Sequence, residues 1–231
     1  MSDFGTPQPP PRFPEPPPPF PTGGSGPPWE SAGMSLQSFI DTAKGVLTDP
    51  VPTFAQMRRE GGLVPPLIYY IVGLVIGTIG SMIWQVIGFG GMGMPFGGPS
   101  TGEAMGGMAL IVIVPIFGLV GLFLGSLIIH FALGLFGGQK YPYETTFRTM
   151  AYAFGSSQPI ALIPFCGGFI SAIWGLIAAI IGLAQTQETT TGKSAAAVLT
   201  PTVICCGLMM IFWGMLFALL VGGAAAGSFA R

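Results

Sequence analysis

The residues that could carry out chemistry are few and scattered. His130 is the only histidine, and the three cysteines are Cys166, Cys205 and Cys206. Ser126 and His130 would share a helix face, but a catalytic serine–histidine pair needs a third group that orients the imidazole, and the pattern offers none. One histidine also falls short of the usual zinc ligand sets. We therefore expect no catalytic residue, no metal site and no cofactor, and hence a protein that is not an enzyme.

Two polar side chains, Gln85 and His130, stand inside long apolar stretches. Ionisable groups within a membrane are costly and often functional. One hypothesis is therefore a small-solute or ion pathway lined by Gln85, His130 and a polar kink at residues 156–158. A proton relay through His130 would need an acidic partner, and no apolar stretch contains one. We favour a neutral imidazole that is hydrogen-bonded locally, and we keep the permease or channel as the alternative.

Five apolar stretches must position these side chains. Half of the residues are hydrophobic and 7% are charged, whereas a soluble domain carries about 25% charged residues. A helix needs about 20 apolar residues to cross the hydrocarbon layer. The predicted spans are residues 64–89, 108–136, 147–164, 165–184 and 196–222. The third is short and polar, so we expect it to kink or to form a tight hairpin with the fourth. The fold class is an all-α transmembrane bundle of five spans.

Basic residues near the span ends fall in alternate connections. Arg58 and Arg59 precede the first span, Lys140 and Arg148 flank the connection between the second and third, and Lys193 follows the fourth. Because basic residues mark the cytoplasmic side of a membrane protein, we predict a cytoplasmic N-terminus and a C-terminus on the opposite side. The expected location is the bacterial cytoplasmic (inner) membrane.

The chain divides into three parts. Residues 1–33 are rich in proline and glycine, which predicts a disordered tail with polyproline II character. It is either a solvated spacer or a ligand for a groove that binds PxxP segments. Residues 34–62 predict two short amphipathic helices, 35–47 and 51–59, that lie in the membrane interface or cap the cytoplasmic ends of the spans. Residues 63–231 form the membrane domain.

Small residues recur at a spacing of four within the spans. Lipid tails are as apolar as leucine, so spans associate through close backbone approach at small residues. The rows predict helix-packing faces that hold the bundle together. The residues concerned are Gly73, Gly77, Gly121, Gly125, Gly175, Gly214 and Ala218.

The second half of the chain resembles the Yip1 family of multi-pass membrane proteins in its prokaryotic form. The similarity rests on GGQKYPYETTFRTMAYAFGSSQPIALIP and GFISAIWGLIAAIIGLAQTQETTTGKSAAAVLTP, with VLTDPVPTFAQMRREGGLVPPLIYY upstream. The resemblance implies five spans, a cytoplasmic N-terminal region and no enzymatic activity. Eukaryotic members resemble vesicle-traffic adaptors with small GTPase partners, but their DLYGP segment is missing here. The matching positions, without an assigned role, are Arg148, Tyr152, Pro159, Trp174 and Lys193.

These observations predict a non-enzymatic protein that organises membrane or recruits partners from its cytoplasmic face. The expected contact surface is the helix pair 35–59 with the loops 140–148 and 185–194. The expected partners are the lipid bilayer, one or more proteins at the cytoplasmic face, and a second copy of the chain. Eight basic residues spread over the whole chain do not form the clustered patch that nucleic acid requires.

Overall fold

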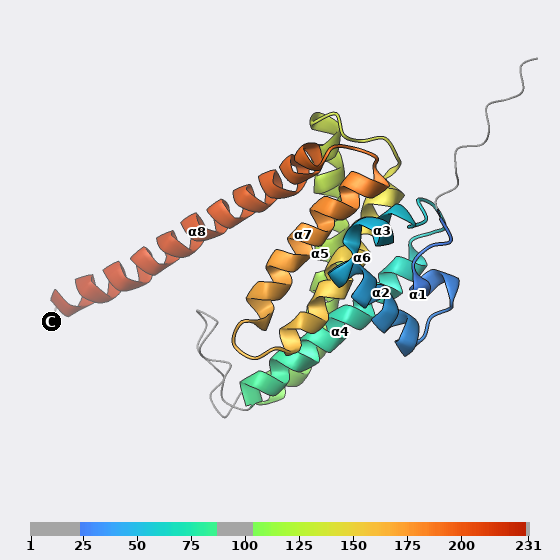
Figure 1. The fold of residues 1–231 in the computed structure, drawn as a ribbon. Coiled ribbons are helices and arrows are strands. Elements are labelled where there is room, and N and C mark those ends of the chain that lie inside the picture. The colour runs from blue at the N-terminus through green and yellow to red at the C-terminus, as the bar shows by residue number, and fades with distance from the viewer. Residues whose placement is uncertain (1–23, 87–103, 230–231) are drawn as a thin grey trace, which may run out of the picture.

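The computed structural model describes residues 24–86 and 104–229, with the side chains of residues 85–86, 104–112 and 218–229 outside the description. The described secondary structure is helical throughout (Figure 1). The elements are α1 (Pro28–Ser31), α2 (Leu36–Thr48), α3 (Pro50–Ala55), α4 (Val64–Val86), α5 (Ala104–Leu135), α6 (Tyr143–Ser157), the 3₁₀ helix η2 (Gln158–Leu162), α7 (Gly167–Thr186) and α8 (Thr191–Phe229). The disorder predicted for residues 1–23 concerns a segment outside the described residues.

Within the described residues, four helices are long and apolar enough to cross a membrane. The candidate spans are Val64–Trp84, Ile113–Leu135, Gly167–Thr186 and Thr191–Phe217, which correspond to the first, second, fourth and fifth predicted spans. The all-helical, multi-pass class is therefore confirmed. The third predicted span, residues 147–164, is not among the four. It consists of α6 and η2, which connect to α7 through a short turn.

Helix α6 lies at the centre of the bundle rather than at its lipid-facing surface. It packs against α2, α4, α5 and α7 (Figure 1), and 12 of its 15 residues are buried. Polar groups in a lipid environment must pair internally, and α6 can carry threonine, serine and arginine because neighbouring helices surround it. This explains why its sequence lacks the apolar signal of a lipid-facing span.

The closest backbone approach joins α4 to α6 and η2, which run side by side. A Cβ atom added at Gly73 would stand 2.2 Å from the carbonyl oxygen of Gly155, and one at Gly77 would stand 2.9 Å from that of Gln158. On α7, a Cβ added at Gly175 would stand 2.8 Å from the Phe154 ring. These three predicted packing glycines therefore lie at contacts that a larger residue would disturb.

Among the described residues, the other predicted packing glycines make no such contact. Nothing lies within 4 Å of a Cβ added at Gly121, Gly125 or Gly214, and the side chain of Ala218 is outside the described residues. Residues with the spacing of four thus lie at close contacts on α4 and α7, whereas Gly121, Gly125 and Gly214 on α5 and α8 have open space around an added Cβ. The reason is that the pattern records small residues, whereas the fold decides which face has a neighbour.

The N-terminal helices cap one end of the bundle. Ser35 begins α2 as a capping box with Ser38, in which a side-chain oxygen accepts from a free first-turn N–H. Helix α2 packs on α6, and α3 packs on α7. These contacts place residues 36–55 against the bundle. The packed region also extends back to α1, where Trp29 is buried, so the tail boundary predicted at residue 33 is too late.

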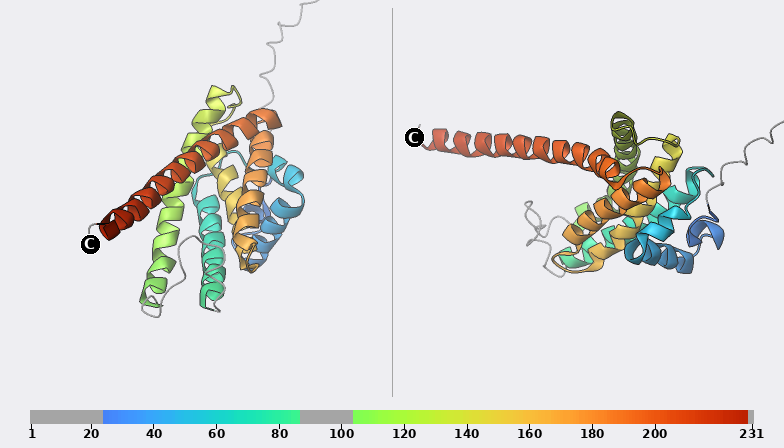
Figure 2. Two further views of the ribbon diagram at one scale, coloured as in Figure 1. Left: turned by 90° about the vertical axis from the view of Figure 1, so that its left-hand side faces the viewer. Right: turned by 45° about the horizontal axis from the view of Figure 1, so that its top comes forward.

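Helix α8 leaves the bundle after its first turns. Ala197 and Val198 are buried against the other helices, and α8 packs on α5 and α7. The rest of the helix, which contains Pro201, projects away from the other helices (Figure 1 and the right-hand view of Figure 2). Its apolar side chains between residues 203 and 217 are mostly exposed. Within one chain, α8 is therefore the span least covered by protein.

Candidate interaction site

Three connections meet at one end of the helices, which we call the basic end: residues 56–63, 136–142 and 187–190. Arg59 links all three, because it donates to the Tyr141 hydroxyl at 2.6 Å, forms an ion pair with Glu188, and accepts at its carbonyl from Thr145 at 3.0 Å. Its guanidinium also lies 4.1 Å from the centre of the Tyr141 ring. Lys193 donates to the carbonyl of Gly137 at 2.9 Å.

The structure therefore brings together four of the predicted basic residues. Arg58, Lys140 and Lys193 are exposed at this end and Arg59 is partly exposed. The opposite end carries the turn between α6 and α7, where Trp84 of α4 donates to the carbonyl of Leu162 at 2.9 Å. Among the described connections, the basic ones therefore lie at one end of the bundle and the uncharged turn between α6 and α7 lies at the other.

Gln187 joins two of these connections from the inside. Its side chain is fully buried, and its Oε1 accepts from the backbone N–H groups of Lys140 at 3.0 Å and Tyr141 at 2.8 Å. Its Nε2 lies 3.0 Å from the Thr146 hydroxyl. A buried amide with this many partners fixes the connection before α6 against the end of α7. Sequence analysis did not identify it, because an isolated glutamine at a helix end gives no pattern.

The pKa values of two titrating groups at the basic end are shifted from their ordinary values. The hydrogen bond from Arg59 lowers the pKa of the Glu188 carboxyl. Loss of hydration, followed by the hydrogen bond with Glu188, raises the pKa of the Tyr141 phenol. At neutral pH, both shifts favour an ionised Glu188 carboxylate and a neutral Tyr141 phenol beside the Arg59 guanidinium.

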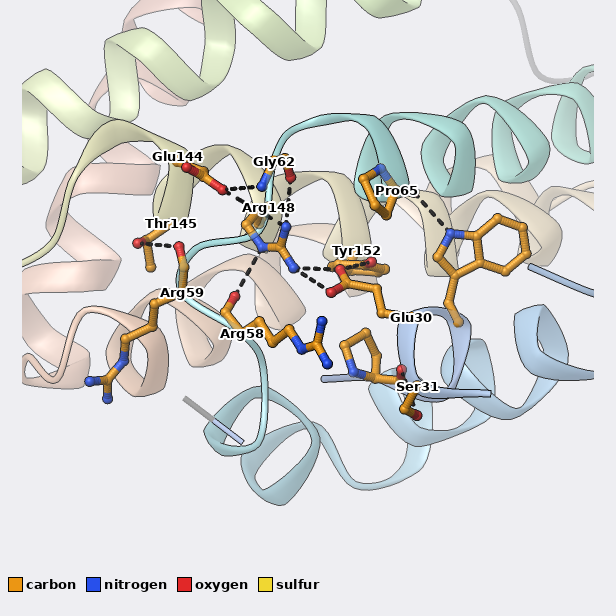
Figure 3. Close-up of polar contacts among 12 residues, drawn as sticks. Glu30, Ser31, Arg58, Arg59, Gly62, Pro65, Glu144, Thr145, Arg148 and Tyr152 are labelled. Atoms are coloured by element: carbon orange, nitrogen blue, oxygen red, sulfur yellow. Dashed lines mark hydrogen bonds and ion pairs between the residues drawn. The ribbon is translucent and has the colours of Figure 1, made fainter. Parts of the chain in front are cut away.

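Arg148 is the largest departure from expectation. It was expected beside a loop, but its side chain is completely buried inside the bundle. Its Nε donates to the carbonyl of Arg58 at 2.9 Å and its Nη1 to that of Gly62 at 2.6 Å. These bonds attach the connection between α3 and α4 to α6 (Figure 3). Arg148 is therefore a structural centre and not part of an accessible basic surface.

The counter-ion of Arg148 comes from the N-terminal segment. Nη2 contacts both carboxylate oxygens of Glu30, at 2.5 and 2.6 Å, and the Tyr152 hydroxyl donates to the same carboxylate at 2.5 Å. Figure 3 shows Glu30 reaching from α1 towards the guanidinium. Glu144 lies 4.0 Å from Nη1 and accepts from the N–H of Gly62 at 2.7 Å. Sequence analysis missed Glu30, because it stands in a segment that was assigned to the tail.

His130 has a local partner on each ring nitrogen. Nδ1 lies 2.8 Å from the Thr146 hydroxyl and Nε2 lies 2.9 Å from the Gln139 amide nitrogen. The ring borders a pocket of about 330 Å³ lined by Leu127, His130, Phe131, Gly134, Leu135 and Gln139. Ser126 pairs with Tyr143 instead of His130. The side chain of Gln85 is outside the described residues.

The described residues contain no group of three His, Cys, Asp or Glu side chains that could hold a metal ion. The three cysteines are free and exposed. The polar side chains connect segments that are far apart in sequence. Glu30 and Arg148 are 118 residues apart, and Arg59 and Glu188 are 129 apart. The site is a polar framework at one end of a set of apolar helices.

Fold and site together define an integral, multi-pass helical membrane protein with an organised polar end. The chain matches the model of the Yip1 domain over residues 44–214 and belongs to this family, whose members are generally non-enzymatic membrane trafficking proteins. No curated protein and no solved structure matches it significantly. The family expected from the sequence is confirmed.

Proposed function

We propose that this Yip1-domain protein is a non-enzymatic membrane organiser of the prokaryotic type. In the proposal, its basic end faces the cytoplasm and recruits protein partners there. The observation that carries the proposal is the way Arg59 and Gln187 join three connections into one rigid surface. A rigid, exposed surface binds a partner with little loss of conformational freedom. The proposed contacts are the exposed side chains of Arg58, Lys140 and Lys193.

In this proposal the chain crosses the membrane five times. Helix α6 alone rises only about 22 Å, since each residue adds about 1.5 Å, which is less than the roughly 30 Å of the hydrocarbon layer. The five residues of η2 add about 10 Å at about 2.0 Å each. Together they reach from the basic end to the level of Trp84. Five passes leave the N-terminus in the cytoplasm of a bacterial cell and the C-terminus outside.

The orientation has a second physical support. Arg58, Lys140 and Lys193 are exposed at the basic end, where anionic headgroups attract each basic side chain by about 1 kcal/mol. The negative surface potential of the cytoplasmic leaflet therefore favours this end on the inner side. The rival proposal, a permease, requires an unpaired polar lining. His130, the residue it depends on, instead has partners on both ring nitrogens.

Site-specific crosslinking in native membranes tests the proposal. A photoreactive amino acid is placed at Arg58 or Lys140, and as a control at Phe117, which is 71% exposed on the apolar surface of α5. We expect discrete protein adducts at the first two positions and lipid adducts at Phe117. The adduct at Arg58 should disappear in a Lys140→Glu background. Absence of protein adducts, combined with solute flux through the reconstituted protein, would favour the permease instead.

A further inference from the structure

The carboxylate of Glu30 occupies a site that the membrane domain itself builds. The region matched by the family model begins at residue 44, so Arg58, Arg148 and Tyr152 lie inside it while Glu30 lies outside. We propose that these three side chains form an anion site, that residues 24–32 are a detachable strap which closes it with Glu30, and that a phosphate group takes the place of Glu30 when the strap lifts.

The charges at the site call for an anion. The Arg148 side chain is 0% exposed and that of Glu30 is 5% exposed, and a buried guanidinium left without its partner is strongly destabilised. The Arg58 side chain lies near the same carboxylate, although the two groups form no ion pair in this structure. A Cβ added at Gly26 would lie 3.3 Å from Glu30 Oε2 and 3.4 Å from Arg58 Nε, and Figure 3 shows the two groups together.

Removal of Glu30 would leave two guanidinium groups against one remaining carboxylate, Glu144, whose nearer oxygen is 4.0 Å from Arg148. Glu144 already accepts from the backbone of Gly62. The emptied site would therefore carry excess positive charge together with the free hydroxyl of Tyr152. Phosphate suits these donors, because a guanidinium binds phosphate oxygens through paired N–H groups. The basic end is also where phosphate headgroups of lipids would lie.

The strap is attached by a few separate contacts. The Trp29 indole donates to the carbonyl of Pro65 at 2.9 Å, and the backbone N–H of Trp29 donates to the Thr42 hydroxyl at 2.9 Å. The Trp29 ring packs edge-on against Tyr69, with 5.5 Å between centres. Gly26 donates to the carbonyl of Gln56 at 3.2 Å. The helix of the strap has only four residues, so its packing on the bundle depends on the buried Trp29 side chain.

The end of the strap is suited to a hinge. Gly33 follows α1 with φ +92° and nothing within 4 Å of an added Cβ, a conformation that favours glycine. Preceding the strap are 23 residues rich in proline. A partner that bound this proline-rich segment would be only a few residues away from Glu30 along the chain. Strap release and anion binding are therefore coupled, because each favours the state that the other requires.

The test uses the full chain in lipid nanodiscs, labelled with 5-fluorotryptophan, so that the fluorine resonance of Trp29 reports the strap. A Trp29→Phe sample assigns the resonance. Two anion sources are compared: inorganic phosphate added to phosphatidylcholine discs, and discs that contain phosphatidic acid. Glu30→Gln weakens the strap without changing its size. The matched control is Glu188→Gln, which removes one charge from the exposed pair with Arg59 at the same end of the bundle.

We expect Glu30→Gln to shift the Trp29 resonance towards that of a solvated indole and to raise phosphate affinity at least tenfold over the Glu188→Gln control. Adding Arg58→Gln, at an exposed position, should lower that affinity severalfold without unfolding the chain. Saturation by inorganic phosphate identifies free phosphate as sufficient, and a response only in phosphatidic acid discs identifies a lipid headgroup. If Glu30→Gln binds in neither arm more tightly than the control, the proposal is wrong.

Discussion

Replacing Gly73 with alanine should loosen the contact between α4 and α6. The added Cβ would stand 2.2 Å from the carbonyl oxygen of Gly155 and 2.9 Å from its carbonyl carbon. The first distance is more than 1 Å short of the 3.4 Å at which ordinary van der Waals contact begins. Both neighbours are backbone atoms, so no side-chain rotation can relieve the overlap. Either α4 or α6 has to move.

Two opposing effects determine the magnitude. Alanine is favoured over glycine in a helix by about 0.8–1.0 kcal/mol, which stabilises the variant. Overpacking of a close-packed interior costs about 1–3 kcal/mol and occasionally more. The upper part of that range applies here, because α6 is enclosed by α2, α4, α5 and α7 and cannot shift without disturbing all of them. We therefore expect a net loss of about 2 kcal/mol, or a melting temperature lower by about 4–8 °C.

The matched control is Gly121→Ala on α5, where nothing lies within 4 Å of the added Cβ. This change should be neutral or stabilising by up to about 1 kcal/mol, since only the helix preference acts. Thermal unfolding of both variants in the same detergent measures the difference. Equal melting temperatures for the two variants would refute the argument, because they would show that α4 and α6 are not in close backbone contact.

Three further outcomes are expected. Gln187→Leu should lower stability by about 2 kcal/mol in detergent unfolding, because it removes the acceptor of two partly buried backbone N–H groups, and an unsatisfied group costs about 1–3 kcal/mol. The control Gln185→Leu should cost less than about 1 kcal/mol. An impermeant maleimide applied outside cells should label native Cys166 at the turn between α6 and α7. It should not label the cysteine introduced by Lys140→Cys. In inverted vesicles the introduced cysteine should be labelled and Cys166 should not. The lowered pKa of Glu188 means that its pair with Arg59 adds stability above the ordinary carboxyl pKa and loses it as the pH falls through the lowered value; the small melting difference between wild type and Glu188→Gln should therefore disappear at low pH.

The apolar helices were predictable because each carries its signal within itself. Helix α4 begins at Val64, as predicted, and α7 at Gly167, within two residues of the predicted start. Length and hydropathy are enough to define such a span, since its environment is lipid for much of its surface. Gly73 was identified on similar grounds, because spacing of small residues marks a face on which another backbone can approach.

Residues whose surroundings come from distant segments were not predictable in this way. Arg148 follows the uncharged Phe147 near the start of a predicted span, a position that resembles a membrane-edge arginine. Its burial depends on Glu30, 118 residues away, and no local pattern connects the two. Gly121 has the same local spacing as Gly73, yet lacks a neighbour. Contacts between segments that are distant in sequence, and not local composition, determine which of these residues is packed.

The position of α6 links the fold to the proposed function. A helix with buried Thr145, Thr149 and Arg148 would be unstable in direct contact with lipid, so α4, α5 and α7 must surround it before the domain is complete. Its polar side chains in turn hold the connections at the basic end: Arg148 fixes the segment before α4, and Thr146 supports Gln187. The surface proposed to bind partners is therefore built by the same helix that the apolar spans protect. A change inside the bundle at α6 should alter partner binding at the basic end even though it touches no exposed residue.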